Sequence, residues 1–233
     1  MDKPLIVAHG GTEASGYRDV LDALDAAITA GADMFEFDVR RTGDGELVVH
    51  HEADVGNRPL AGVDYSTAAR EASRLGYHLP RLREILDATR GRLHLDVELK
   101  EAGYEDDVVR SVTDGRFGFD EIIVTSFELA AIAAVRAAHP RVKTGLLVYD
   151  VSGATALQMF RRCGCTLLGP DYRILDDDTL EEAAASAIPL VPWTVNEPAV
   201  MRRLLDAKAV KGVITDRPAL GIDIRHELCR RSP

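Results

Sequence analysis

One short stretch of the chain carries ionisable groups at a spacing that could do chemistry. Glu36 and Asp38 alternate with apolar residues, so in a β-strand both carboxylates lie on one face, about 7 Å apart. Asp44-Gly45 predicts a two-residue hairpin turn, because this pair accepts the positive φ that a tight turn needs. With these two residues at the centre of the turn, His51 lies opposite Asp38 and shares its face. Two acids and an imidazole would therefore converge.

A third carboxylate, Glu98, ends a later run of alternating residues, and we expect it to join the first two. Three neighbouring carboxylates repel one another and raise one another's pKa values unless something neutralises them. A bound divalent cation would do so, and an all-oxygen set of ligands favours Mg2+ or Ca2+ over zinc. The alternative is an ion network in which the acids pair with Lys100, Arg40 or Arg41.

Two histidines accompany these acids. His9 directly follows the first apolar run of the chain, and His51 ends the returning arm of the hairpin. Imidazole titrates near neutral pH, so the two side chains are a candidate acid–base pair. Trp193 is the only tryptophan of the chain, and it either lines a pocket wall or covers the rim of the fold.

The elements that must position these residues are short β-type runs alternating with amphipathic helical patterns. Predicted strands cover residues 5–8, 34–38, 93–98, 122–125, 144–148, 166–168, 189–194 and 212–215, and residues 47–50 form the returning arm of the hairpin. Predicted helices cover residues 17–30, 82–89, 105–112, 129–138, 152–163, 177–187 and 198–207, the first closed by a C-cap at Gly31.

This alternation implies parallel strands joined by right-handed crossovers. Eight such units in 233 residues predict an α/β fold, a lean (β/α)8 TIM barrel that forms a single domain over residues 1–233. The alternative fold is a doubly wound open sheet. Residues 52–80 predict a short excursion over one face of the barrel. In a parallel barrel the active site lies at the C-terminal strand ends, which is where the polar residues named above stand.

Composition narrows the possible functions. The net charge of −10 makes nucleic acid and an anionic membrane surface poor partners. No stretch reaches the roughly 18 apolar residues of a membrane-spanning helix, so stable membrane insertion is not expected. Three cysteines are too few for a secreted disulfide scaffold, and we expect all three to be buried or free thiols. A cytoplasmic protein is the default expectation, and the oligomeric state stays open.

A series of short motifs runs nearly end to end along the chain. The motifs are His9 with Gly11, Ala27-Ile28-x-Ala30-Gly31-Ala32-Asp33, Glu36-x-Asp38-Val39, Thr42-x-Asp44-Gly45, Val48-Val49-x-His51, Leu79-Pro80-x-Leu82-x-Glu84, Glu98-x-Lys100, Ser126-Phe127, Trp193-Thr194-Val195-Asn196 and Thr215-Asp216-Arg217-Pro218. In this order they resemble the glycerophosphodiester phosphodiesterases, within the phospholipase C-like phosphodiesterase barrels.

The resemblance implies metal-dependent hydrolysis of a small glycerophosphodiester to glycerol 3-phosphate and an alcohol. By that resemblance His9 and His51 are the general acid and base, the three carboxylates hold the metal, and Lys100 helps to bind the phosphate. Two other activities stay open. One is a lysophospholipase D or another phosphodiesterase on the same scaffold, and the other is a barrel that binds phosphodiesters without turnover.

The chain departs from the family pattern at two places. The family usually has an arginine directly after the first histidine, where it contacts the phosphate, and here that residue is Gly10. The family also has a Pro-Glu-Asn-Thr segment before the first helix, and its second position falls on Arg18. We hypothesise that Arg18 supplies the missing guanidinium; otherwise it lies on the surface and the phosphate pocket has changed.

Overall fold

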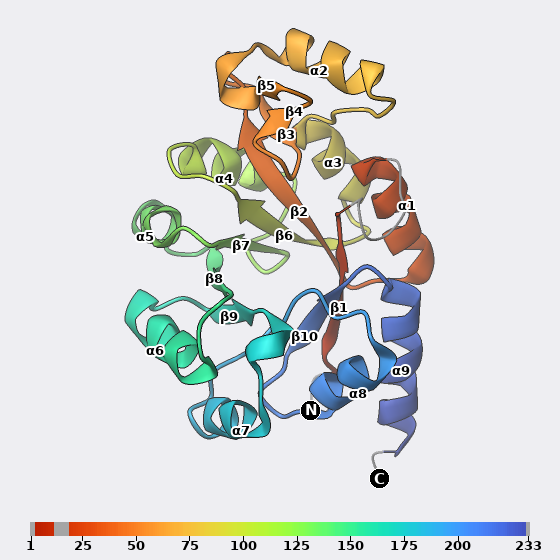
Figure 1. Ribbon diagram of the computed structural model, residues 1–233, viewed down its shortest axis with the longest axis vertical. Coiled ribbons are helices and arrows are strands. Elements are labelled where there is room, and N and C mark those ends of the chain that lie inside the picture. The colour runs from red at the N-terminus through yellow and green to blue at the C-terminus, as the bar shows by residue number, and fades with distance from the viewer. Residues whose placement is uncertain (1–2, 12–18, 232–233) are drawn as a thin grey trace.

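The sheet of this protein is parallel and curls into a barrel (Figure 1). The computed structural model describes residues 3–11 and 19–231. The neighbouring strands follow the order β10-β1-β2-β6-β7-β8-β9, and each adjacent pair is parallel. Their bounds are β1 Leu5–His9, β2 Met34–Arg41, β6 His94–Leu99, β7 Ile122–Ser126, β8 Lys143–Val148, β9 Leu167–Pro170 and β10 Gly212–Thr215.

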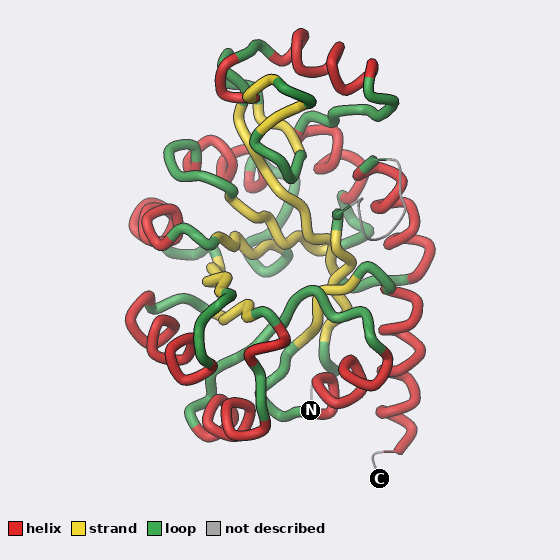
Figure 2. Tube along the Cα trace, viewed as in Figure 1, coloured by secondary structure: helices red, strands yellow, loops and turns green. Residues whose placement is uncertain are grey.

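The eighth position of the barrel is filled by residues 189–195, which Figure 2 draws as loop between β9 and β10. Pro189 and Pro192 have no N–H to donate, so the predicted regular strand is reduced to isolated bridges. Backbone hydrogen bonds nevertheless join the segment to both neighbours. The Leu168 N–H donates to the Pro189 carbonyl at 3.0 Å, and the Lys211 N–H donates to the Leu190 carbonyl at 2.8 Å. The predicted (β/α)8 barrel is therefore confirmed, and the open sheet is not the fold.

Helices surround the barrel between successive strands (Figure 1). Helix α1 begins after Asp19, whose side chain accepts from two backbone N–H groups, and ends at Gly31 with φ 74°, as the predicted C-cap requires. Two helices, α2 and α9, were not expected from the sequence pattern. The bounds of the helices are α1 Val20–Ala30, α2 Tyr65–Arg74, α3 Leu82–Thr89, α4 Glu105–Thr113, α5 Leu129–Ala138, α6 Gly153–Cys163, α7 Asp177–Ala185, α8 Pro198–Asp206 and α9 Pro218–Arg231, with 3-10 turns η1 Leu60–Gly62 and η2 Tyr172–Ile174.

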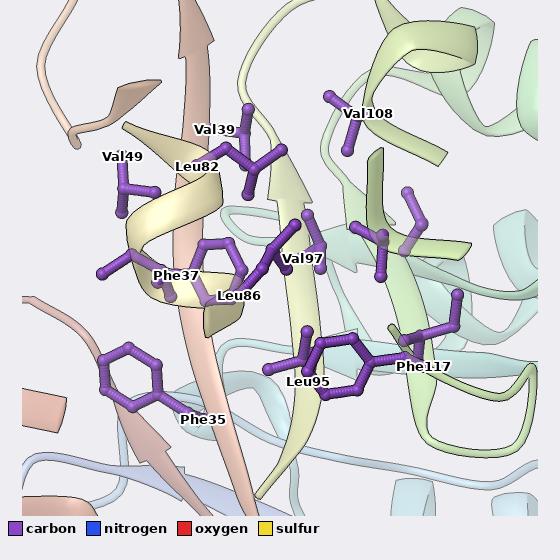
Figure 3. Close-up of a cluster of buried hydrophobic side chains, with 14 of the residues drawn as sticks. Phe35, Phe37, Val39, Val49, Leu82, Leu86, Leu95, Val97, Val108 and Phe117 are labelled. Carbon is purple, nitrogen blue, oxygen red and sulfur yellow. The ribbon is translucent and has the colours of Figure 1, made fainter. Parts of the chain in front are cut away.

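The alternating side chains of β2 and β6 divide between two environments. Phe35, Phe37 and Val39 point out of the barrel, and with Leu95 and Val97 of β6 they pack in a buried cluster beneath the helices (Figure 3). Each is at most 1% exposed, which corresponds to about 1.5–3 kcal/mol of burial per large side chain. Because this outer face holds the strands in place, the intervening polar side chains are fixed on the inner face.

The excursion predicted after strand 2 is a small lobe at one end of the molecule (Figure 1). It contains β4 (Asp54–Val55), β5 (Arg58–Pro59), η1 and α2, and it packs against β3 (Leu47–Val49). The lobe has its own apolar core, made by Val48, Val55, Leu60, Ala68, Ala72 and Leu79.

The hairpin between β2 and β3 differs by one residue from the predicted register. Val39 pairs with Val49, so the residue opposite Asp38 is His50 and not His51. The loop has three residues: the Thr42 N–H donates to the Glu46 carbonyl at 3.0 Å, and a glycine at the last loop position has φ 89°. The excursion favours this longer loop, because the carbonyls of its η1 turn accept from the loop backbone.

The expectation that all three cysteines are buried or free thiols is wrong for two of them. Cys163 and Cys165 are joined by a disulfide, with 5.4 Å between their Cα atoms. The chain reverses there, because Gly164 between them ends α6 with φ 65° and brings the two side chains together. Cys229 is a free, exposed thiol. Among the described residues, none of the helices is both long and apolar enough to cross a membrane.

Candidate active site

Three buried carboxylates meet at the C-terminal end of the barrel, as the sequence predicted. Glu36 and Asp38 come from β2 and Glu98 from the adjacent β6, where Asp38 pairs directly with Glu98. One oxygen from each lies within 4.8 Å of the others, and the residues are only 4%, 6% and 7% exposed. The cluster exists because parallel pairing and period-two alternation place inward carboxylates side by side.

Burial strongly favours the neutral forms of Glu36 and Glu98. Burial raises the pKa of Glu36 well above its ordinary value, and the charges of Asp38 and Glu98 raise it further. Burial and the charge of Asp38 raise the pKa of Glu98 to about 8, although Lys100 opposes the change. The Lys100 ammonium lies 2.6 Å from Glu98 Oε1 and 3.2 Å from Asp38 Oδ1.

A divalent cation fits this cluster. One monovalent Lys100 cannot neutralise three carboxylates, and Glu36 Oε2 is a buried oxygen with no hydrogen-bond partner among the described residues. Hard oxygen donors of this kind are the ligands that divalent cations such as Mg2+ and Ca2+ prefer. The alternative ion network is present only in part. Lys100 joins the acids, but Arg40 pairs with Glu101 and Arg41 lies 3.9 Å from an acid of α4.

A fourth inward carboxylate lies one step deeper in the barrel. Asp96 of β6 is 4% exposed and accepts a 2.7 Å hydrogen bond from the Thr125 hydroxyl. Burial raises the pKa of Asp96 to about 7, although that hydrogen bond lowers it. It therefore lies beneath the three carboxylates and adds to their negative charge.

His9 is held in place by a chain of hydrogen bonds that sequence reasoning did not foresee. Its Nδ1 lies 2.7 Å from Asp216 Oδ1, and its Nε2 lies 3.7 Å from Glu36 Oε2. The other oxygen of Asp216 accepts from the Asn196 side chain at 2.6 Å. Burial alone would raise the pKa of Asp216, but the hydrogen bond and charge of His9 and the hydrogen bond from Asn196 outweigh it and leave the pKa lowered.

This arrangement orients the His9 imidazole. A carboxylate at Nδ1 favours the tautomer with the proton on that nitrogen and leaves Nε2 as a proton acceptor facing the acids. Asp216 and Asn196 both stand within motifs quoted above, so the motifs were visible in the sequence. The pairing itself was not, because 207 residues separate His9 from Asp216.

His51 reaches the site although it is not opposite Asp38. The chain turns after β3, and the Arg40 guanidinium donates to the His51 carbonyl from both Nε and Nη2, at 2.9 Å and 2.7 Å. Nδ1 of His51 lies 2.8 Å from Glu52 Oε1. Arg40 therefore anchors the backbone of this loop, and a carboxylate at Nδ1 again leaves Nε2 available.

Two cavities meet at the two histidines, and His9, His51 and Asp38 line both. The barrel cavity, about 590 Å³, is lined by the carboxylate cluster, Lys100, Thr125, Phe127, Leu147, Tyr149, Trp193, Thr194 and Ile214. The excursion cavity, about 570 Å³, lies between the start of α1 and the excursion lobe. Both volumes suit a small organic ligand.

Trp193 forms part of a pocket wall, which was one of its two predicted locations. It lines the barrel cavity with Phe127 and Tyr149. The Phe127 ring meets the Trp193 ring edge to face with centroids 5.4 Å apart, and it meets the Tyr149 ring in the same way at 5.5 Å. The indole N–H donates to the Gly169 carbonyl at 2.8 Å, so the ring is anchored to β9.

A side chain on either of the two glycines after His9 would lie too close to its neighbours in this structure. A Cβ on Gly10 would lie 2.5 Å from the Glu36 carbonyl oxygen, and a Cβ on Gly11 would lie 2.3 Å from the His9 ring. The Gly10 N–H also donates to that same Glu36 carbonyl at 2.8 Å. The backbone of this turn therefore packs directly against the site. Arg18, the predicted substitute for the family's arginine, lies outside the described residues.

Comparisons with known proteins identify the family and the relatives of this chain. The model of the glycerophosphoryl diester phosphodiesterase family matches residues 9–71 and 81–220 of the chain. A glycerophosphodiester phosphodiesterase from Caldanaerobacter subterraneus subsp. tengcongensis is 28% identical over 242 residues, which cover 95% of this chain and 98% of the relative. A glycerophosphodiester phosphodiesterase from Bacillus subtilis is also 28% identical, over 94% of this chain and 85% of its own length.

Solved structures share the fold. A putative glycerophosphoryl diester phosphodiesterase from Silicibacter pomeroyi superposes with a TM-score of 0.83 at 23% identity, covering 97% of this chain and 94% of that one. A phosphodiesterase from Oleispira antarctica, solved in complex with the product sn-glycerol-3-phosphate, gives a TM-score of 0.81 at 19% identity, covering 95% and 96%.

Proposed function

The chain belongs to the glycerophosphoryl diester phosphodiesterase family, and we propose that it hydrolyses small glycerophosphodiesters to glycerol 3-phosphate and an alcohol. The observation that carries the proposal is the meeting of Glu36, Asp38 and Glu98 with the Asp216-bound His9 in one cavity. An acid cluster suited to a cation and an oriented imidazole are what acid–base cleavage of a phosphodiester needs. The activity named for the relatives supports the same reaction.

In the proposed site the three carboxylates hold a divalent cation, Mg2+ or Ca2+. When bound, such a cation withdraws negative charge from the phosphate and makes a neighbouring hydroxyl more acidic. Lys100 lies beside the cluster and adds a positive charge for the phosphate oxygens. Trp193 contributes the apolar wall against which the glycerol carbons pack.

The two histidines are proposed to move the protons. His9, whose Nε2 faces the acid cluster, accepts the proton of the glycerol C2 hydroxyl, and the freed oxygen attacks phosphorus. The bond from phosphorus to the other alcohol breaks, and His51 donates a proton to the departing oxygen. Water then opens the resulting cyclic phosphate, with the roles of His9 and His51 exchanged.

Release of glycerol 3-phosphate tests this function. The protein is incubated with glycerophosphocholine, glycerophosphoethanolamine and glycerophosphoglycerol, with EDTA or with Mg2+ or Ca2+. We expect turnover that needs the cation and falls by a factor on the order of 10² or more in His9→Asn and in His51→Asn. Activity that persists undiminished in EDTA would remove the cation from the proposal. A protein that binds these diesters without releasing product would be a non-catalytic barrel.

Arg18 is tested separately, because the departure at Gly10 makes it the proposed source of the guanidinium that binds the phosphate. Arg18→Ala is expected to raise KM or lower kcat strongly, and Arg18→Lys to recover part of the loss by restoring the charge. Kinetics of Arg18→Ala close to those of the unmodified protein would show that the phosphate is bound without it. The matched control is Arg70→Ala, which removes an exposed guanidinium on α2.

A further inference from the structure

The excursion cavity is not used by the reaction as described so far. It is lined by the start of α1 and by the excursion, and it shares His9, His51 and Asp38 with the barrel cavity. A phosphodiester carries two organic substituents on one phosphorus. If the phosphate lies at the shared wall, one substituent extends into each cavity.

The glycerol substituent belongs in the barrel cavity. Its C2 hydroxyl must lie beside the carboxylate cluster to be activated, and Glu36 and Glu98 line the barrel cavity alone. The departing alcohol is then directed into the excursion cavity, past His51, the proposed donor of its proton. This assignment rests on the proposed function.

The lining of the excursion cavity sets the chemical class of that alcohol. The residues that line it include the acids Asp19, Asp38, Glu52 and Asp54, and no lysine or arginine among the described residues. The carboxylate of Asp54 has no hydrogen-bond or ion-pair partner within the described part of the chain.

An aromatic surface completes the lining. The rings of Tyr77 and His50 stack with centroids 5.9 Å apart and an interplanar angle of 11°, and both line the cavity. Aromatic faces attract organic cations, and nearby carboxylates add to that attraction. The aromatic wall of the barrel cavity is less suitable, since Lys100 Nζ already lies 5.9 Å from the centre of the Phe127 ring and would repel a second cation.

We propose that the excursion cavity receives the departing alcohol of the diester and selects alcohols that carry an ammonium group. Choline and ethanolamine are examples of the favoured alcohols, and uncharged polyols such as glycerol are disfavoured. The selectivity comes from Asp54 and Tyr77, which contact the alcohol and take no part in the bond cleavage.

The first test compares kcat/KM for glycerophosphocholine and glycerophosphoethanolamine with kcat/KM for the uncharged glycerophosphoglycerol. At low ionic strength the ammonium substrates are expected to be favoured about five-fold or more, and added salt should reduce the preference because Asp54 is exposed to solvent. Asp54→Asn and Tyr77→Leu should each lower kcat/KM for the ammonium substrates about two- to five-fold more than kcat/KM for the uncharged substrate. The matched control is Asp150→Asn, which removes an exposed carboxylate outside both cavities.

The second test does not depend on turnover. Calorimetric titration compares choline with 3,3-dimethylbutan-1-ol, which has the same shape without the charge. Choline is expected to bind more tightly, and Asp54→Asn should remove most of the difference. Equal binding of the two alcohols would overturn the selectivity.

The outcomes separate this proposal from the proposed function. If glycerophosphoglycerol is cleaved as efficiently as the choline ester, the cavity assignment fails and the function stands. If the ammonium preference survives Asp54→Asn and Tyr77→Leu but is lost in Tyr149→Leu, the ammonium group lies in the barrel cavity and the assignment is overturned. If no diester releases glycerol 3-phosphate, the proposed function fails, and the titration decides the ligand class of the cavity by itself.

Discussion

Replacing Glu98 by glutamine should stabilise the protein when no divalent cation is present and destabilise it when one is. In the folded protein, burial and the charge of Asp38 raise the pKa of Glu98 to about 8, against an ordinary value of 4.5. A carboxyl group with a raised pKa in the folded state favours folding most at low pH, and that contribution is lost as the pH rises from about 4.5 towards 8.

The magnitude follows from these two values. Between pH 4.5 and pH 7, each unit of pH lowers the free energy of unfolding by about 1.4 kcal/mol because Glu98 must lose its proton in the unfolded state but keeps it in the folded state. At pH 7 the raised pKa of Glu98 therefore lowers the free energy of unfolding by about 3 kcal/mol. Glutamine has no such proton to lose, and its amide oxygen still accepts from Lys100. Because the amide also lacks the charge that attracts Lys100, we expect a net gain of about 1–3 kcal/mol for Glu98→Gln in EDTA.

Adding the cation should reverse the order. A cation at a thousand times its dissociation constant stabilises the unmodified protein by about 4 kcal/mol, which exceeds the advantage of the variant in EDTA, whereas the variant has lost one of three ligands and gains much less. The assay is urea-induced unfolding followed by the fluorescence of Trp193, the only tryptophan, at pH 7 in EDTA and in Mg2+ or Ca2+.

The control for this experiment is Glu128→Gln, which neutralises an exposed carboxylate near the same rim and should change little. Repeating the EDTA measurement at pH 4.5 should shrink the advantage of Glu98→Gln, because the carboxyl group is then protonated in the folded state. A variant less stable than the unmodified protein in EDTA, or one that the cation stabilises equally, would refute the account of the cluster.

Three further substitutions test the supports of the site. Asp216→Asn should lower kcat on the order of 10- to 100-fold by misorienting His9. Because the pKa of Asp216 is lowered in the folded protein, its contribution to stability is present at neutral pH and disappears as the pH falls below about 3.8, which acid-unfolding curves of the two proteins would reveal. Gly10→Ala places a Cβ 2.5 Å from the Glu36 carbonyl oxygen. We expect the free energy of unfolding, measured with denaturant, to fall by about 1–3 kcal/mol and turnover to decrease. Unchanged stability would contradict the observed packing. Leu60 is 1% exposed in the core of the excursion lobe, so Leu60→Ala leaves a cavity there and should lower the free energy of unfolding of the lobe by about 2–5 kcal/mol. Limited proteolysis should then cut the excursion first. Equal resistance to proteolysis across the chain would count against a separate small core.

Much of the candidate site could be predicted because it depends on local periodicity. In β2 the alternation of aromatic and acidic residues determines which side chains face the helices and which face the barrel interior. The same rule on β6 places Glu98 beside Asp38 once the strands are parallel neighbours. The C-terminal end of α1 was also visible, since Gly31 has the chemistry that ends a helix, whereas the N-cap at Asp19 was not predicted.

Other features depend on contacts between distant parts of the chain. The hairpin register shifted because the carbonyls of η1 in the excursion bind the loop backbone, and a turn dipeptide alone does not include that interaction. The prolines at 189 and 192 left an irregular eighth segment, which backbone hydrogen bonds and the buried side chains of Leu190 and Val195 join to the barrel.

The amino-acid sequence by itself determined the alternating strands and helices of the barrel and the inward carboxylates, because these follow from local periodicity that parallel pairing carries into space. Only the tertiary structure decided how those groups are used. Barrel closure brings Asp216 to Nδ1 of His9, and the excursion, held by its own core, adds a second cavity beside His51. Pairings across such separations have no local signal, since they follow from the positions of whole elements once the barrel has closed.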